Sequence, residues 1–107
     1  MAGLIVLRPD VDWSASGGLF DWTLEFLIPR LSDDDAAARL QEIVDNNLGS
    51  LWISEFPAQV QRRILRELGD NLLAAAREDL PETGAKQDVL AHLQELESLS
   101  RRVAGQL

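Results

Sequence analysis

The sequence predicts a mainly α-helical single domain over residues 1–107, with about four helices around one core and a short extended N-terminal segment. Three observations predict this class. Apolar residues recur every three or four positions along most of the chain, and 46% of all residues are hydrophobic. The length of 107 residues suffices for one core and leaves little room for two.

The N-terminal segment is the one part that reads as extended. Residues 4–7 form an apolar run with two β-branched members, and Pro9 follows closely. Such a run predicts a short strand or an extended segment packed on the core. The next stretch, residues 10–18, is rich in Asp, Ser and Gly, which is typical of a loop.

Residues 19–28 support two interpretations. Large apolar residues alternate with polar ones, which is typical of a strand, but the same residues also form one face of a helix. Ser16 would cap this helix and Pro29 would end it. We favour the helix because the rest of the chain is helical. The alternative is an α+β domain with an N-terminal hairpin from residues 3–8 and 20–28.

Ser32 begins the next predicted helix. It can cap the helix, and the three following Asp residues suit the positive end of the helix dipole. An apolar stripe runs from Ala37 to Leu48, and Gly49 lies where the helix should end.

Two further helices complete the predicted core. After an apolar bridge at residues 51–53, Ser54 caps a long helix whose apolar residues recur every fourth position as far as Ala76. Gly69 should bend or split that helix. Beyond a turn at residues 81–84, the last helix covers about residues 86–103.

The charge is unevenly distributed. The chain carries −8 at pH 7, of which residues 1–57 contribute −7 and residues 58–107 contribute −1. This balance argues against binding to nucleic acid, which requires basic residues against phosphates, and against anionic membranes. The basic residues Arg62, Arg63 and Arg66 cluster in the second half, where they can pair with acidic groups or face water.

The six aromatic residues are also confined to the first half, between residues 13 and 56. We expect Trp22, Phe26 and Trp52 to build the core. Trp13 lies in the predicted loop between acidic and polar residues, and we take it as an exposed anchor for a partner, because Trp is enriched at binding hot spots. The predicted partner-binding residues are Asp10, Asp12, Trp13, Asp21, Glu25, Asp33 and Asp34.

The chain has no Cys and one His, so thiolate chemistry and multi-His metal sites are absent. A carboxylate pair at Asp10 and Asp12 and the set Asp88, His92 and Glu95 are weak metal patterns. We therefore predict no catalytic residues, no metal and no cofactor. The N-terminus lacks the basic and long apolar regions of a signal peptide, which predicts a soluble cytoplasmic protein.

These features favour non-enzymatic protein binding. The expected function is that of an acidic inhibitor of the immunity type, which covers a basic partner such as a toxin or nuclease. No motif in the chain matches a particular family. The alternatives are a self-associating helical adaptor, which would form a homodimer, and a carboxylate- or metal-dependent enzyme.

Overall fold

The chain begins with a β-hairpin in the computed structural model, which describes residues 2–106. Strand β1 (Ala2–Arg8) pairs antiparallel with β2 (Val11–Ser16), so that Ile5 lies opposite Trp13. The prediction of a loop over residues 10–18 is therefore wrong for residues 11–18, because Gly17 and Gly18 begin the first helix and residues 11–16 form β2. Apolar and polar residues alternate there, and the apolar ones pack toward the core, a period of two that the Asp- and Ser-rich composition conceals.

Strand β3 (Ser50–Trp52) lies parallel to β1 and completes a three-stranded sheet in the order β2-β1-β3. Gly49, immediately before β3, has a φ of +77°, which favours glycine. Its carbonyl oxygen accepts a hydrogen bond of 2.9 Å from the Leu4 amide. Strand β1 is therefore the central strand, with a neighbour on each side.

Residues 17–27 form helix α1 (Gly17–Leu27), which confirms the helical interpretation of that segment. The Ser16 hydroxyl caps α1 by accepting a hydrogen bond from the Leu19 amide, as the sequence predicts. A 3₁₀ turn over Ile28–Arg30 follows and contains Pro29. The alternative hairpin between residues 3–8 and 20–28 is wrong, because the partner of β1 is the nearer segment β2.

Helix α2 (Asp34–Asp45) occupies the predicted region, but its cap differs from the predicted one. Asp33 is the N-cap residue, and its Oδ1 accepts a hydrogen bond of 2.9 Å from the Ala36 amide. The prediction of Ser32 as the cap is therefore wrong by one residue. Asp34 lies in the first turn, where its charge favours the helix dipole.

The long predicted helix is divided into α3 (Ala58–Asp70) and α4 (Leu72–Asp79). The break falls at Asn71 and not at Gly69, and the Asn71 amide group donates to Glu67 Oε1 at 2.9 Å. Helix α3 begins after Pro57 rather than at Ser54, which lies in a 3₁₀ turn over Ile53–Glu55.

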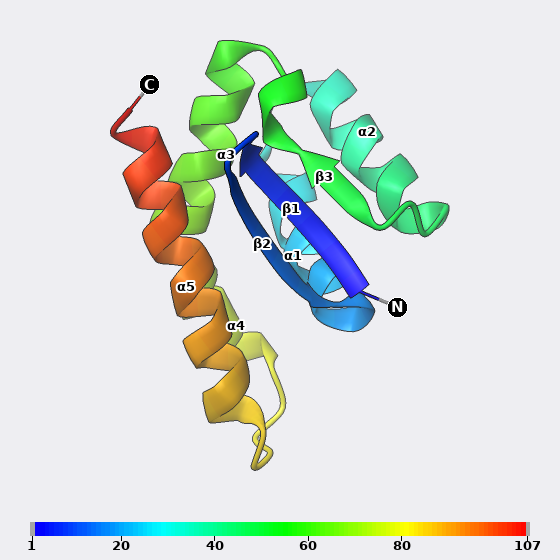
Figure 1. The fold of residues 1–107 in the computed structure, drawn as a ribbon. Coiled ribbons are helices and arrows are strands. Elements are labelled where there is room, and N and C mark those ends of the chain that lie inside the picture. Colours follow the sequence, from blue (N-terminus) through cyan, green and yellow to red (C-terminus); the bar gives the residue numbers. More distant parts are fainter. Residues whose placement is uncertain (1, 107) are drawn as a thin grey trace.

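Helix α5 (Lys86–Ala104) matches the predicted last helix and packs against α3 and α4. Residues 2–106 thus contain five α-helices, one more than predicted, because the long helix is split. The prediction of a mainly α domain with a short β segment at the N-terminus is confirmed (Figure 1). None of the helices within residues 2–106 has the length and apolar character needed to cross a membrane.

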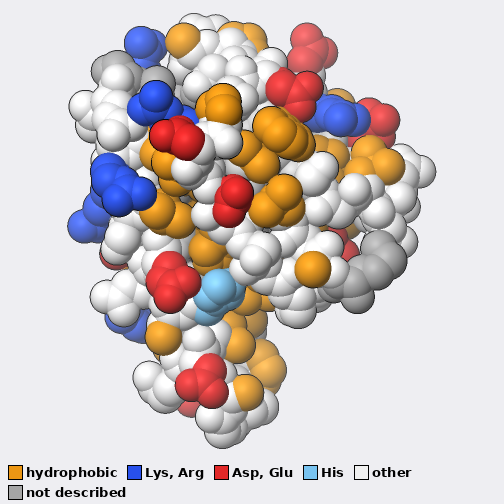
Figure 2. All heavy atoms as spheres, in the orientation of Figure 1, with side chains coloured by type: hydrophobic (Ala, Val, Ile, Leu, Met, Phe, Trp, Pro, Cys, Tyr) orange, Lys and Arg blue, Asp and Glu red, His pale blue; other side chains and the backbone are white. Residues whose placement is uncertain are grey.

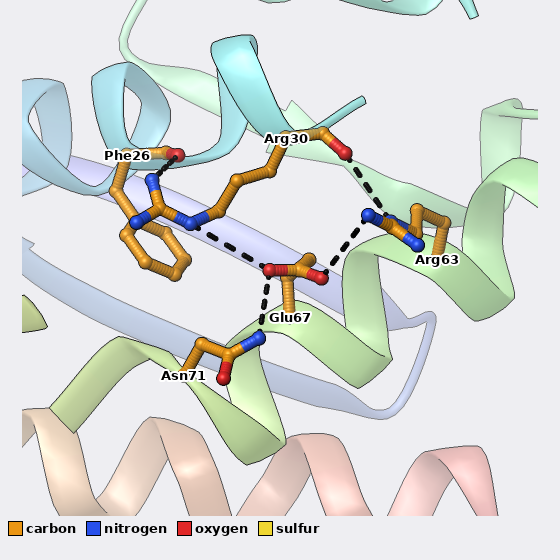
Figure 3. A network of polar contacts seen from close by, with 5 residues as sticks. All are labelled: Phe26, Arg30, Arg63, Glu67 and Asn71. Atoms are coloured by element: carbon orange, nitrogen blue, oxygen red, sulfur yellow. Dashed lines mark hydrogen bonds and ion pairs between the residues drawn. The ribbon is translucent and has the colours of Figure 1, made fainter. Parts of the chain in front are cut away.

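A buried carboxylate joins the end of α1 to α3. The Glu67 side chain is only 7% exposed and lies 3.6 Å from Arg30 Nε and 3.5 Å from Arg63 Nη2 (Figure 3). The Arg30 guanidinium also lies over the Phe26 ring, 4.0 Å from its centroid. These contacts satisfy the buried charge and fix α3 against the segment that leads from α1 to α2.

Candidate functional site

The two faces of the sheet differ in what covers them. Residues paired across neighbouring strands point to the same face, so Gly3, Ile5 and Trp13 share the face that carries α1. Helix α1 lies behind the sheet in Figure 1, and within residues 2–106 no helix crosses in front of it. The front face therefore remains accessible.

We call this accessible surface the open sheet face. Leu4 and Val6 from β1 are paired with Ser14 and Asp12 on one side and with Ser50 and Trp52 on the other. The members of the open sheet face are therefore Leu4, Val6, Asp12, Ser14, Ser50 and Trp52. Hydrophobic side chains gather over the strands on this face (Figure 2).

Trp52 is the most distinctive member of the open sheet face. Its side chain is 43% exposed, whereas Val6, its neighbour on β1, is only 4% exposed. Neither Val6 nor Leu4 belongs to the main core cluster, because both point away from it. The expectation that Trp52 builds the core is wrong, since the strand register places its side chain outward. Phe26 is buried as expected, and Trp22 is half-buried and stacks on Phe26.

Acidic side chains lie on the open sheet face and at its ends. Asp12 lies on the open sheet face itself, and Asp10 and Glu55 are exposed at the ends of the strands. The one basic neighbour on the hairpin, Arg8, lies 3.9 Å from Asp10 and is thus partly neutralised. The open sheet face therefore combines an apolar centre with a negative margin.

A hollow of about 210 Å³ lies beside Trp52. Its lining comes from β3, α2 and the 3₁₀ turn that follows β3: Arg39, Ile43, Ser50, Leu51, Trp52, Glu55 and Phe56. The basic residue of the lining, Arg39, is paired with Glu42 at 3.4 Å. Glu55, the acidic residue of the lining, forms no ion pair among residues 2–106. The hollow has room for one partner side chain next to the indole ring.

The structure divides the predicted acidic surface into separate parts. Asp10 and Asp12 lie at the open sheet face, whereas Asp21 and Glu25 belong to α1, which covers the opposite face. Asp21 is half-buried near the start of β1, and Glu25 is exposed.

Asp33 and Asp34 occupy a third location, the beginning of α2. Asp33 is engaged in capping, and it lies across a groove from the arginines of α3. One surface that contains all the predicted acidic residues is therefore not formed.

Trp13 is buried, and the prediction of an exposed anchor at this position is wrong. The residue is 3% exposed, and its Nε1–H donates a hydrogen bond of 3.0 Å to the His92 carbonyl oxygen on α5. The indole also stacks on the His92 ring with a centroid distance of 4.8 Å. Trp13 therefore fastens the edge of the sheet to α5, and Trp52 replaces it as the exposed ring.

The weak metal patterns do not develop into a metal centre among residues 2–106. His92 Nδ1 lies 3.2 Å from Glu95 Oε2, and His92 Nε2 lies 2.5 Å from the Ser14 carbonyl oxygen. No group of three or more His, Asp or Glu side chains within the described residues is arranged to hold an ion. His92 thus connects α5 to β2.

No family model matches the chain, and neither a curated protein nor a solved structure matches it. The open sheet face and its charge are therefore the features that indicate a function.

Proposed function

We propose that this protein is a non-enzymatic binding domain whose open sheet face covers a basic protein partner. The observation that carries the proposal is the exposed Trp52 on a sheet face that also carries Asp12 and has Glu55 beside the ring. In cells, such a domain acts as an inhibitor of the immunity type, because it blocks the basic surface that a nuclease or toxin uses on its own substrate. The absence of Cys suits a reducing compartment such as the cytoplasm.

The exposed ring provides the affinity. A Trp side chain presents up to about 250 Å², and with 43% exposed, Trp52 offers about 100 Å² for burial. At about 25 cal/mol per Å², its burial contributes about 2–3 kcal/mol. The hollow beside Trp52 accommodates a side chain of the partner, which completes the burial of the ring.

The charge provides the selectivity. Asp12 lies on the open sheet face, Asp10 and Glu55 lie at its ends, and the basic Arg8 is paired with Asp10. A negative surface of this kind accelerates association with a basic protein and repels acidic ones. The association rate should therefore fall steeply as the salt concentration rises.

Self-association through the same face is the second candidate, and the exposed Trp52 favours it. Two copies would each bring a charge of −8 and would place the acidic margins of both molecules close together. Like charges facing each other across an interface are unfavourable, so a basic partner fits the open sheet face better. Light scattering distinguishes the two: the proposal expects a monomer of 11.9 kDa at low salt.

Affinity capture with matched variants tests the proposal. The proposal expects the wild type to retain a protein of high isoelectric point, and Trp52→Ala and the pair Asp10→Lys/Asp12→Lys to lose it. The controls are Trp22→Ala and Asp21→Lys/Glu25→Lys, which make the same chemical changes on α1. Retention of the basic protein by Trp52→Ala or by Asp10→Lys/Asp12→Lys would contradict the proposal. Capture of an acidic protein by the wild type would contradict it as well.

A further inference from the structure

A second surface, which is basic rather than acidic, lies along α3. A groove of about 510 Å³ separates α3 from the segment that leads into α2. Its lining consists of Leu31, Ser32, Asp33, Gln59, Val60, Arg62, Arg63 and Arg66. None of these residues belongs to the sheet, so this groove is independent of the proposed function.

The groove is positively charged in a protein of net charge −8. Arg62 and Arg66 are exposed, and among residues 2–106 neither forms an ion pair. The one acidic residue in the lining is Asp33, whose Oδ1 accepts the capping hydrogen bond from the Ala36 amide. Two guanidinium groups are therefore free to bind an anion.

Arg63 lies between Arg62 and Arg66 in the sequence and has two partners within the chain. Its Nη2 lies 3.5 Å from Glu67 Oε2, and its Nε donates a hydrogen bond of 3.2 Å to the Arg30 carbonyl oxygen (Figure 3). Because Glu67 is buried and also contacts Arg30, the part of the wall that Arg63 forms is held in place before any ligand arrives. A wall fixed in advance lowers the entropy cost of binding.

The spacing of the free arginines selects the shape of the ligand. Arg62 and Arg66 are four residues apart on α3, so they share one face and are separated by about 6 Å along the helix axis. Alternate residues of an extended peptide are separated by about 6.6 Å and point to the same side. Carboxylates on alternate residues therefore match the two guanidinium groups, and Arg binds carboxylates in a bidentate manner.

We propose that this groove binds an extended acidic peptide segment with carboxylates on alternate residues. Leu31 and Val60 are largely buried and form its apolar part. The negative charge elsewhere on the protein does not prevent binding at physiological salt, since charges more than about 8 Å apart are screened.

Fluorescence anisotropy with a labelled peptide tests this proposal on the intact protein. The probe is Glu-Ser-Glu-Ser-Glu at physiological salt, and the permuted peptide Glu-Glu-Ser-Ser-Glu has the same charge without the alternate spacing. We expect saturable binding of the probe and affinity at least about fivefold lower for the permuted peptide, since the second bidentate contact is lost. Equal affinity for both peptides, or no saturable binding, would overturn the proposal.

Charge-reversal variants locate the site. Arg62→Glu/Arg66→Glu should weaken binding of the probe at least about tenfold, because two charge-assisted contacts become repulsive. Arg77→Glu/Arg102→Glu makes the same change in net charge on α4 and α5 and should leave the affinity within about twofold. Circular dichroism confirms that each variant is folded. An equal loss of affinity for the probe in the two double variants would show general attraction of anions and overturn the proposal. Displacement of the probe by inorganic phosphate at the concentration of the probe would do the same.

Discussion

Gly3 lies where α1 approaches the sheet most closely, and its replacement by Ala tests which face of the sheet is covered. A Cβ atom at residue 3 would lie 2.5 Å from Phe20 Cδ1 and even closer to Phe20 Cγ and Cβ. Rotation of the Phe20 ring cannot relieve the overlap, because Phe20 Cβ is fixed to the backbone of α1. The helix must move away from the sheet, or the strand must bend.

The expected cost follows from this geometry. Forcing an extra methyl group into a well-packed core typically costs about 1–3 kcal/mol, and we place Gly3→Ala at the upper end. The better strand propensity of Ala returns about 0.5–1 kcal/mol, which leaves a net loss of about 2 kcal/mol. For a domain of this size, the melting temperature should fall by roughly 10 °C.

Urea unfolding monitored by tryptophan fluorescence measures this difference, with Gly18→Ala as the control. No atom lies within 4 Å of a Cβ added at Gly18, which is in the first turn of α1. Gly18→Ala should therefore be neutral or stabilising by up to about 1 kcal/mol. Equal stability of Gly3→Ala and the wild type would refute the placement of α1 on this face.

Three other substitutions test individual contacts of the fold, and two of them have a matched control. Trp13→Phe removes the hydrogen bond to α5 and part of the ring, so unfolding free energy should fall by about 1–2 kcal/mol in chemical denaturation. Arg30→Ala leaves a buried carboxylate with one fewer partner and should cost about 2 kcal/mol, whereas Arg39→Ala breaks an exposed pair and should stay within about 0.5 kcal/mol. Asp33→Ala removes the observed cap of α2 and should lower the melting temperature by an amount equivalent to about 1 kcal/mol, while Ser32→Ala should change it little. Similar losses for the two members of either pair would contradict these assignments.

Local signals in the sequence predict the helices well. Ser16 caps α1, and the acidic residues after Ser32 mark the beginning of α2 to within one residue. The last helix is predicted almost to its ends. These features depend on contacts between neighbours in the sequence, so a single chain suffices to find them.

Features that depend on distant contacts are the ones the sequence misses. The short strand β2 looks like a polar loop by composition, and it becomes a strand because β1 and α5 bury Trp13. The break at Asn71 falls inside an apolar pattern of helical period that continues from α3 into α4, so the pattern does not reveal it. Propensity and periodicity carry no information about such partners.

The candidate site also combines features that the sequence reveals with features that depend on distant contacts. The sequence correctly places the acidic excess and the aromatic residues in the first half, but it does not reveal which of them share a surface. Because α1 packs on one face of the sheet, Asp21 and Glu25 are separated from Asp12. Trp52 faces outward because it is paired with Val6, whose side chain points to the open sheet face. That pairing forms only when β3 lies beside β1 in the folded chain.

Titration calorimetry with the captured basic partner measures directly how much the open sheet face contributes to binding. Trp52→Ala should raise the dissociation constant at least about thirtyfold, as expected for a loss of about 2 kcal/mol or more at a hot spot, while Trp22→Ala should leave it within about twofold. Asp10→Lys/Asp12→Lys should also weaken binding at low salt, whereas Asp21→Lys/Glu25→Lys should keep both the affinity and the salt dependence of the wild type. Unchanged affinity in Trp52→Ala, or equal losses in both Trp variants, would contradict the assignment of the open sheet face as the binding surface.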